Sequence, residues 1–373
     1  MAKIAINGGG MVGAALALGL AERHQVVLFD HATPSASEAQ WDLRISSVSQ
    51  GNLNWLARWQ IEDLVDKHKC RDYQQLEIID QRGQRLVCDA EDVAEARLGA
   101  MIENRALRHA LWQRLPQNVT QVVGDPLQVW QPQQQLLTCQ SGQQFPVDLL
   151  IGCDGARSWV AQQQDFAVVA EDYDQDCILA LAKLPQAVSA KTWQQFRDEG
   201  PIALLPLTQN QVCLILYQRR QTVVRWGAED SMADRVSDAF QPYLGQLSIS
   251  QLASFPLRRQ HARRYHVGAH TALAGDAAHT IHPMAGLGVN LGFHDARQLV
   301  ASLNNGISEA ALANYQRQCQ RYNRKALALL DGLHRLNTGN GAERLLRPLQ
   351  SAALTLLGQV PQMRKWFIRQ ALN

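Results

Sequence analysis

Several hallmarks of membrane, secreted and nucleic-acid-binding proteins are missing from this sequence. It has no run of about 18 apolar residues, so no segment is predicted to span a bilayer. Its seven cysteines show neither C-x-x-C nor zinc-ligand spacing, and most lie in apolar, strand-like runs, which favours reduced, buried thiols in a cytoplasmic protein. A net charge of only +2 argues against nucleic-acid binding.

Leader and linker signals are also absent. The chain enters an apolar, strand-like run within its first residues, which leaves no room for a signal peptide. It contains no internal repeat and no low-complexity linker. A length of 373 residues predicts about two domains with ample apolar core.

The N-terminal segment combines a strand, a glycine-rich turn and a helix. Residues 3–7 are a short apolar run, residues 8–13 read G-G-G-M-V-G, and residues 14–20 are small and apolar with helical character. A G-x-G-x-x-G turn between a strand and a helix is typical of a dinucleotide site, because the helix N-terminus offers free N–H groups and partial positive charge to a pyrophosphate.

Each glycine of this turn has a physical reason. Gly8 permits the tight turn, Gly10 lets the backbone approach the phosphates, and Gly13 allows the helix to pack closely on the strand. A second strand over 25–29 ends at Asp30, where a carboxylate can accept the hydroxyls of a ribose. These features predict a dinucleotide but leave NAD and FAD both open.

A second glycine-rich region lies far along the chain. Residues 275–279 read G-D-A-A-H, in which small side chains surround one carboxylate, Asp276, that suits hydrogen bonds to sugar hydroxyls. Residues 283–288 supply one proline and two glycines for another tight turn, and a helix is predicted to start near residues 289–290. The N-terminus of a helix stabilises negative charge that lies close to it.

These motifs resemble those of the class A flavoprotein monooxygenases, the aromatic hydroxylases. Residues 275–290 resemble the flavin-ribityl motif of that family, and residues 282–295 look more narrowly like its ubiquinone-biosynthesis hydroxylases. Residues 153–158, C-D-G-A-R-S, resemble the D-G motif that contacts the FAD pyrophosphate and the transient NAD(P)H. Residues 41–49 resemble the segment whose arginine contacts the flavin, and residues 103–112 resemble the helix whose start faces FAD.

The resemblance covers essentially the whole chain and implies an α/β fold. In that fold a Rossmann-like FAD-binding domain is interleaved with a β-sheet substrate domain and followed by a helical C-terminal tail. The implied segments are 1–70, 99–170 and 260–330 for the FAD-binding domain, 71–98 and 171–259 for the substrate domain, and 331–373 for the tail. The motifs and the resemblance together predict cofactor contacts by Gly8, Gly10, Met11, Val12, Gly13, Asp30, Arg44, Asn104, Asp154, Gly275, Asp276, Pro283, Gly286, Leu287, Gly288, Val289 and Asn290.

The chemistry that the resemblance implies is hydroxylation of a polyprenylated benzoquinol or phenol ring in ubiquinone biosynthesis. NAD(P)H would reduce FAD and leave, and O2 would then add to the reduced flavin to give the C4a-hydroperoxyflavin that transfers one oxygen atom to the ring. No general base is identified, since the oxygens of a quinol already activate its ring. His279 and His282 are expected to shape the flavin turn rather than to act in catalysis, and no metal is expected, because no carboxylate or cysteine cluster completes a zinc site.

Two departures from the family pattern keep other interpretations open. Leu287 stands where the family usually has glutamine, and Ala161 stands where the D-G motif usually ends in arginine. They lend weight to a scaffold protein in a ubiquinone-biosynthesis assembly, with or without flavin. A sibling hydroxylase acting at another ring carbon carries the same motifs, whereas a flavin halogenase is disfavoured because no W-x-W-x-I-P segment is present.

The C-terminal tail carries a separate signal. Residues 343–373 contain five basic residues and one acidic residue, interleaved with large apolar side chains. This pattern predicts one or two basic amphipathic helices broken at Pro361. Such helices either pack on the body of the protein or rest on anionic lipid or partner proteins, and both can hold at once. A surface contact of this kind would give a cytoplasmic protein a peripheral place on a membrane.

Overall fold

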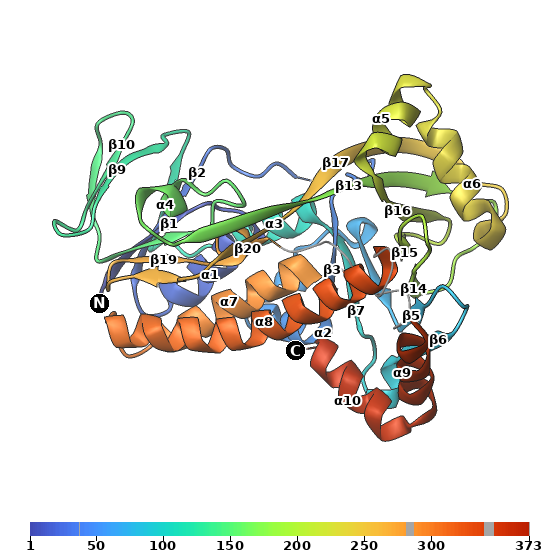
Figure 1. Cartoon of the computed structure of the whole chain (residues 1–373). Coiled ribbons are helices and arrows are strands. Elements are labelled where there is room, and N and C mark those ends of the chain that lie inside the picture. The colour runs from blue at the N-terminus through green and yellow to red at the C-terminus, as the bar shows by residue number, and fades with distance from the viewer. Residues whose placement is uncertain (37, 281–286, 339–346, 373) are drawn as a thin grey trace.

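The computed structural model describes residues 1–36, 38–280, 287–338 and 347–372 (Figure 1). Its two largest sheets have six and eight strands and stand side by side, joined by the long strands β13 (Val168–Lys183) and β17 (Ser248–Ala262). The α/β architecture expected from the sequence is confirmed.

The six-stranded sheet carries the N-terminal glycine turn. Its order is β18-β19-β12-β1-β2-β8, and all neighbours pair in parallel except β18 and β19. Parallel strands are covered on both faces, and Ile4, Ala5 and Ile6 of β1 are fully buried accordingly. The strands are β1 (Lys3–Asn7), β2 (Gln25–Asp30), β8 (Val119–Val123), β12 (Leu149–Gly152), β18 (His266–Val267) and β19 (Thr271–Leu273).

Helix α1 (Met11–Ala21) follows the glycine turn as predicted and packs against α7 (Leu287–Leu303). Residues of α1 are buried continuously from Gly13 to Ala21, so this helix has no solvated face. A Cβ added at Gly19 would lie 2.6 Å from Val300 Cγ2, so the two helices approach too closely for a side chain there. α3 (Asn104–Gln113) also packs on α1.

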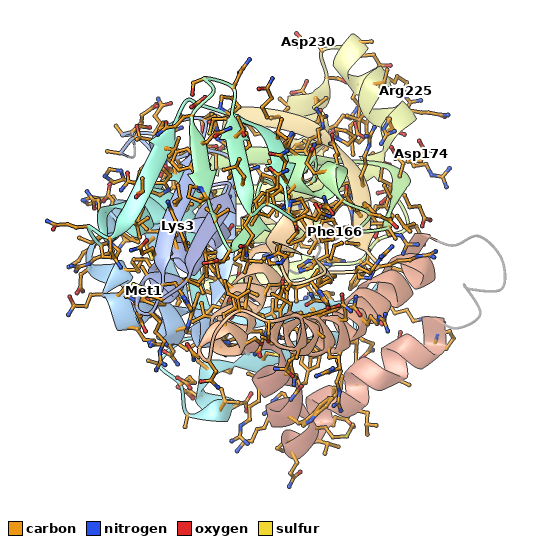
Figure 2. All side chains as sticks on the ribbon, turned by 90° about the vertical axis from the view of Figure 1, so that its left-hand side faces the viewer. Met1, Lys3, Phe166, Asp174, Arg225 and Asp230 are labelled. Carbon is orange, nitrogen blue, oxygen red and sulfur yellow. The ribbon has the colours of Figure 1, made fainter. Side chains whose placement is uncertain are left out.

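The eight-stranded sheet runs in the order β20-β17-β13-β16-β15-β14-β5-β6. Side chains of β13 alternate between its faces: Ile178 and Ala180 pack under α5 (Arg220–Ala228) and α6 (Met232–Leu244), while Cys177 and Leu179 point to the other face. Arg225 and Asp230 mark the outer end of this domain, away from Lys3 in β1 (Figure 2). Its other strands are β5 (Gln75–Ile79), β6 (Arg85–Asp89), β14 (Lys191–Gln195), β15 (Ile202–Pro206), β16 (Gln211–Arg219) and β20 (His279–Thr280).

Two three-stranded sheets complete the described body. One, β3-β7-β4, carries the segments at residues 45–49, 99–103 and 70–73, and the other, β11-β10-β9, carries those at residues 144–146, 136–139 and 127–131. The remaining elements are β3 (Ile45–Ser49), β4 (Cys70–Tyr73), β7 (Gly99–Glu103), β9 (Leu127–Gln131), β10 (Leu136–Cys139), β11 (Gln144–Pro146), α2 (Gln50–Leu56) and α4 (Trp159–Gln163), with short 3-10 turns at 57–59, 61–63, 67–69, 90–93 and 275–277.

The C-terminal segment is helical, as predicted. α8 (Glu309–Thr338) runs on past residue 331, and the tail proper consists of α9 (Arg347–Gln359) and α10 (Pro361–Leu372), which meet at the predicted break. α9 packs on β6 through buried Leu354, and Arg364 of α10 pairs with Asp92 at 2.7 Å. The tail therefore packs on the edge of the eight-stranded sheet (Figure 1).

All seven cysteines are free thiols, and five of them are buried. This agrees with the expected absence of disulfides. In the described part of the chain no helix combines the length and the apolar character that crossing a bilayer requires.

We predict that Gly19→Ala lowers the free energy of unfolding by about 1–3 kcal/mol, because its methyl group collides with Val300. Alanine is the better helix former by about 1 kcal/mol, so a loss of stability reports the collision. Denaturant unfolding should show that Val300→Ala, added to Gly19→Ala, relieves part of this cost. Gly227→Ala is the control, since its Cβ would lie 3.8 Å from the nearest atom, Met232 Cε. A Gly19→Ala protein as stable as the wild type would contradict the prediction.

Candidate functional site

A cavity of about 1700 Å³ lies between the two large sheets. Its wall includes the glycine turn after β1, the Cys153–Arg157 segment, the turn after β19, the first residues of α7 and one face of the eight-stranded sheet. Single-ligand pockets usually measure about 300–1000 Å³, so this cavity has room for a large cofactor and a second molecule.

The glycine turn forms one end of the cavity by backbone contacts that exclude side chains. A Cβ on Gly8, whose φ is +104°, would lie 2.4 Å from the Cys153 carbonyl oxygen, and one on Gly13 would lie 1.9 Å from the Gly8 oxygen. Gly10 differs, because a Cβ there would meet no described atom within 4 Å. Gly8 and Gly10 line the cavity, while Gly13 lies behind its wall. The open space beside Gly10 leaves room for a phosphate group.

Asp30 lies beside this turn, at the end of β2. Its carboxylate accepts a hydrogen bond from the Gly9 N–H at 2.6 Å, pairs with Arg108 at 3.0 Å and lies 2.8 Å from His31 Nδ1. Arg108 and Trp112 also donate to the Gly9 carbonyl, at 2.9 and 2.7 Å. Asp30 is thereby fixed at the cavity wall, where the sequence predicts a ribose-binding carboxylate.

Asp154 lines the middle of the cavity. Its Oδ2 accepts hydrogen bonds from Asn7 Nδ2 at 2.8 Å and from the Trp159 N–H at 2.7 Å, so it orders the start of α4. Its Oδ1 is buried and has no partner among the described residues. Burial raises the pKa of this carboxyl, and hydrogen bonds from Ser158 and the backbone oppose that effect. An unpartnered buried oxygen is costly unless a ligand satisfies it.

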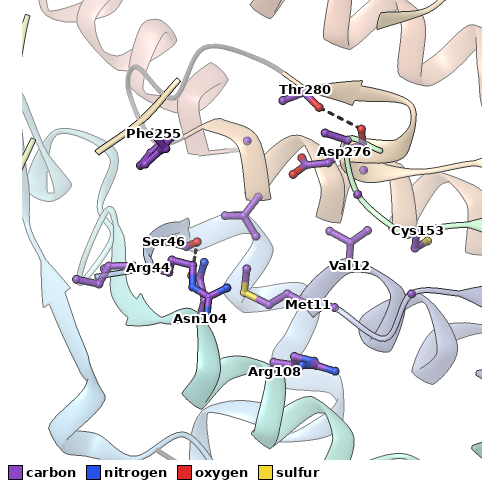
Figure 3. A pocket seen from close by; sticks show the side chains of 18 of the residues that line it. Met11, Val12, Arg44, Ser46, Asn104, Arg108, Cys153, Phe255, Asp276 and Thr280 are labelled. Carbon is purple, nitrogen blue, oxygen red and sulfur yellow. Dashed lines mark hydrogen bonds between the residues drawn. The ribbon is translucent and has the colours of Figure 1, made fainter. Parts of the chain in front are cut away.

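Arg44, Ser46 and Asn104 lie together further along the wall (Figure 3). Ser46 donates to Asn104 Oδ1 at 2.6 Å, which ties β3 to the start of α3. The Arg44 side chain is 76% exposed and pairs with Asp42 at 3.3 Å. An exposed pair of this kind contributes at most about 1 kcal/mol, so Arg44 can turn toward a ligand at little cost.

A buried ion pair supports the loop that carries Arg44. Lys69 Nζ lies 3.1 Å from Glu103 Oε2, and both side chains are almost fully buried. Glu103 also accepts the Asp42 N–H at 2.9 Å, and Lys69 donates to the Gln40 carbonyl at 2.6 Å. The pair therefore holds both the loop and the start of α3 in place.

Gly275 and Asp276 form a tight turn after β19. Gly275 has a φ of +63°, and its Cβ position lies 3.3 Å from Val12 Cγ1, so glycine is required there. The Asp276 carboxylate opens into the cavity beside Thr280, whose hydroxyl donates to the Asp276 carbonyl at 3.2 Å (Figure 3). Although open to the cavity, Asp276 is enclosed by protein, and this burial raises its pKa, while the charge of His279 opposes the shift.

The start of α7 reaches the cavity through Gly288 and Val289. Asn290 points elsewhere: its amide donates to the Ser47 carbonyl at 2.8 Å and accepts the Ser49 N–H at 2.9 Å. It thus fastens α7 to β3 behind the cavity wall. Predicted residues that lie outside the described part of the structure are His282, Pro283, Gly286 and the side chain of Leu287.

The opposite wall is the face of the eight-stranded sheet turned away from α5 and α6. It is mainly apolar, with Leu76 and Ile78 of β5 and Leu179 of β13 among its members, and Phe255 of β17 lies across from the glycine turn (Figure 3). Among the described lining residues of β5 and β13–β17, none is Asp, Glu or His. Further members include Cys177, Thr192, Gln194, Ala203, Leu205, Ile215 and Tyr217, and Arg258 and Arg259 of β17 also line the cavity.

Sequence reasoning missed Arg108 and Trp112, which hold the glycine turn from α3. They follow Asn104 at intervals of four residues, so all three side chains lie on the same helical face. That spacing is the signal that could have assigned them to the site once Asn104 was assigned to it.

The residues present fit FAD. The glycine turn offers an open backbone cradle, and Asp276 and Asp154 present carboxylate oxygens without protein partners among the described residues. Phosphate binds at a glycine turn before a helix, and sugar hydroxyls are donors that carboxylates accept.

Comparison with solved structures shows the same fold. p-Nitrophenol 4-monooxygenase PnpA of Pseudomonas putida aligns with a TM-score of 0.78 over 100% of this chain and 99% of its own, at 16% identity. PqsL of Pseudomonas aeruginosa, a probable FAD-dependent monooxygenase, aligns with a TM-score of 0.75 over 91% of this chain and 97% of its own, at 20% identity.

Sequence comparison reaches the same family. The chain is 37% identical to 3-demethoxyubiquinol 3-hydroxylase of Escherichia coli, over 87% of this chain and 85% of that protein. It is 30% identical to the ubiquinone hydroxylase UbiL of Rhodospirillum rubrum, over 100% of this chain and 90% of that protein. Residues 1–329 match the family described as the FAD binding domain, and the chain therefore belongs to this family of FAD-dependent aromatic-ring monooxygenases.

Proposed function

We propose that this enzyme hydroxylates the ring of a polyprenylated benzoquinol in ubiquinone biosynthesis, using NAD(P)H and O2. The observation that carries the proposal is a single cavity with FAD-motif residues at one end and an apolar sheet wall at the other. A ring that bears a long apolar tail needs such a wall. The 37% identity to 3-demethoxyubiquinol 3-hydroxylase supports the same ring position here.

The cavity-lining members of the predicted set are proposed to hold FAD. They are Gly8, Gly10, Met11, Val12, Asp30, Arg44, Asn104, Asp154, Gly275, Asp276, Gly288 and Val289. We also propose that residues 1–70, 99–170 and 260–330 form the FAD-binding domain, and residues 71–98 and 171–259 the substrate domain.

Bound FAD supplies the hydride acceptance from NAD(P)H and the activation of O2 that hydroxylation requires. The protein contributes position and charge. Gly288 and Val289 bring the N-terminus of α7 to the cavity, where unpaired backbone N–H groups stabilise negative charge. The apolar wall of β5 and β13 excludes water from the reacting groups.

Two tyrosines that line the cavity, Tyr217 of the sheet wall and Tyr73 of β4, offer hydroxyl groups rather than a base. Burial raises the pKa of Tyr217 well above its usual value and also raises the pKa of Tyr73, with Ser47 opposing the shift at Tyr73. Both hydroxyls therefore stay neutral near pH 7 and can orient a substrate oxygen by hydrogen bonding. A quinol ring activated by its own oxygens fits a site of this kind.

The two alternatives make different demands on the same cavity. A sibling hydroxylase would differ in the ring carbon that faces the flavin end, so product regiochemistry separates it. A scaffold would not need the cavity at all. The presence of Ala161, where the family usually has arginine, gives little support to the scaffold alternative. Ala161 lies in α4, donates its N–H to Ser158 Oγ and does not line the cavity.

The tail helices are proposed to rest on an anionic membrane surface, as suits an enzyme whose substrate has a lipid tail. On α9 and α10, Leu356, Met363 and Trp366 are 50%, 39% and 62% exposed, and Lys365 is exposed beside them. Neither helix contains Asp or Glu. An exposed tryptophan with cations and no acidic neighbours on its helix complements anionic lipid. The protein would then be cytoplasmic with peripheral membrane contact.

The central prediction is that FAD-loaded enzyme, given NADPH, O2 and a short-tailed demethoxyubiquinol, forms a product heavier by one oxygen atom. Mass spectrometry of the product and NADPH consumption should agree in amount. Peroxide measured in the same reaction reports leakage of water into the cavity. NADPH consumption that yields peroxide alone would count against this substrate.

Replacing Gly288 tests the cofactor site. A Cβ at Gly288 meets no described atom within 4 Å, so Gly288→Val should fold yet fill the space beside the α7 N-terminus. We expect FAD content after purification to fall strongly, with a smaller fall for Gly288→Ala. Gly227→Val, in an exposed turn of α5, is the matched control for the effect of valine on a helix, where valine is a slightly better helix former than glycine. Full FAD content and normal turnover in Gly288→Val would refute this assignment.

Vesicle sedimentation tests the membrane contact. The wild type should sediment with vesicles of phosphatidylcholine and phosphatidylglycerol more than with phosphatidylcholine alone, since each cation near an anionic surface contributes about 1 kcal/mol. Trp366→Ser combined with Lys365→Glu should abolish the difference. Val224→Ser, at a side chain 65% exposed on α5, should change nothing. A wild type that ignores both vesicles would overturn the membrane proposal and leave partner proteins as the candidates for this face.

A further inference from the structure

Behind the Gly275–Asp276 turn lies a buried polar cluster, defined here as Asp295 of α7, His279 of β20 and Asn323 of α8. All three side chains are at most 1% exposed, and none lines the cavity. Groups of this polarity are costly to bury unless each is paired. Their contacts show what they support.

One carboxylate holds both ends of the 275–279 segment. Asp295 Oδ2 accepts the Gly275 N–H at 3.0 Å and lies 2.5 Å from His279 Nε2. Its other oxygen accepts a hydrogen bond from Asn323 Nδ2 at 3.2 Å. The Gly275 amide is itself buried, so without Asp295 it would lose its acceptor.

The cluster also joins three elements around the turn. β20 carries His279 and pairs with β17 of the substrate sheet, with His279 opposite His261. α8 adds a second brace, because Tyr315 donates to the Leu273 carbonyl at 2.7 Å, just before the turn. The turn is therefore supported from α7, α8 and the eight-stranded sheet at once.

Each member of this pair favours the charged form of the other. Burial acts to raise the pKa of Asp295, but the charge of His279 and hydrogen bonds from His279, Asn323 and Gly275 outweigh it and lower that pKa. Burial acts to lower the pKa of His279, and the charge and hydrogen bond of Asp295 outweigh it and raise that pKa. Other titratable or charged groups facing the pair are Asp276, Cys153, His261, Tyr265, His294, Tyr315, Cys319 and Arg324.

We propose that Asp295 and His279 are positioning residues for FAD: their buried ion pair fixes the backbone of the Gly275–Asp276 turn so that the Asp276 carboxylate faces the cofactor. The inference rests on the proposed contact between Asp276 and FAD. The test of this inference measures flavin retention, so its outcome does not depend on which ring the enzyme hydroxylates.

The variant Asp295→Asn removes the negative charge of this side chain but keeps its size and shape. The amide can still accept the Gly275 N–H, but it no longer favours a protonated His279, whose pKa then falls below its usual value of about 6.5 because of burial. A buried base with a lowered pKa makes the folded state less stable as pH falls below that value, because the unfolded state binds more protons. The variant should therefore hold FAD well at high pH and lose it as pH falls.

The experiment measures FAD release from diluted holoenzyme by flavin fluorescence between about pH 5 and pH 8, a range that extends well below the usual histidine pKa of about 6.5. Wild-type retention should not fall toward low pH, because Asp295 raises the pKa of His279 and so favours its charged form there. For Asp295→Asn the FAD dissociation constant should rise about 10-fold from the high to the low end, the size typical of losing a residue that orients a ligand-binding group. Asp295→Leu should weaken binding throughout.

Gln320→Leu is the matched control. Gln320 also lies on α8 and is nearly buried, but it donates to the Arg263 carbonyl and does not touch the 275–279 segment. It should keep wild-type FAD retention at every pH. A flat profile for Asp295→Asn, or equal FAD loss in Gln320→Leu, would overturn the proposal. If Asp295→Leu does not fold, the nearly isosteric asparagine variant still decides the question.

Discussion

The side chain of Val12 packs directly against two glycines from the far end of the chain, Gly275 and Gly292. The arrangement of the site depends on this contact. A Cβ at Gly292 would lie 2.5 Å from Val12 Cγ2, and one at Gly275 would lie 3.3 Å from Val12 Cγ1. A side chain would collide with Val12 at Gly292 and would be strained and tightly packed at Gly275, where φ is +63°, so glycine at both positions lets the first helix of the chain reach α7 and the turn after β19. The parallel pairing of β1 with β12, and of β12 with β19, brings these segments to the same edge of the sheet. Two glycine-rich motifs distant in sequence thereby line one cavity.

Three of the acidic residues that line the cavity are held in place by contacts within the protein. Asp30 is fixed by the Gly9 amide and Arg108, and Asp154 by Asn7 and the start of α4. Asp276 differs, because its backbone is held from behind while its carboxylate opens into the cavity. Rigid placement lowers the cost of ordering these groups when a ligand binds against them.

The sequence was informative where the chain itself restricts the backbone. Glycine and proline chemistry within a few residues predicts the strand, turn and helix around Gly8–Gly13 and the helix break at Pro361. Pairings between distant residues could not be derived this way. Three contacts depend on how remote segments of the chain meet. They are the hydrogen bond from Asn290 to β3, the ion pair of Lys69 with Glu103, and the hydrogen bond from the Gly275 N–H to Asp295. Local patterns contain no information about such partners.

The strands β13 and β17 are 16 and 15 residues long and pair with each other along most of their length. Because side chains alternate along a strand, Leu179 points into the cavity while its neighbours Ile178 and Ala180 point under α5 and α6. Size changes at every second position can therefore reshape the chamber without moving the backbone that frames the flavin end. In an architecture of this kind, related enzymes can acquire a preference for a different ring by replacing side chains on the sheet, while the backbone around the flavin stays unchanged.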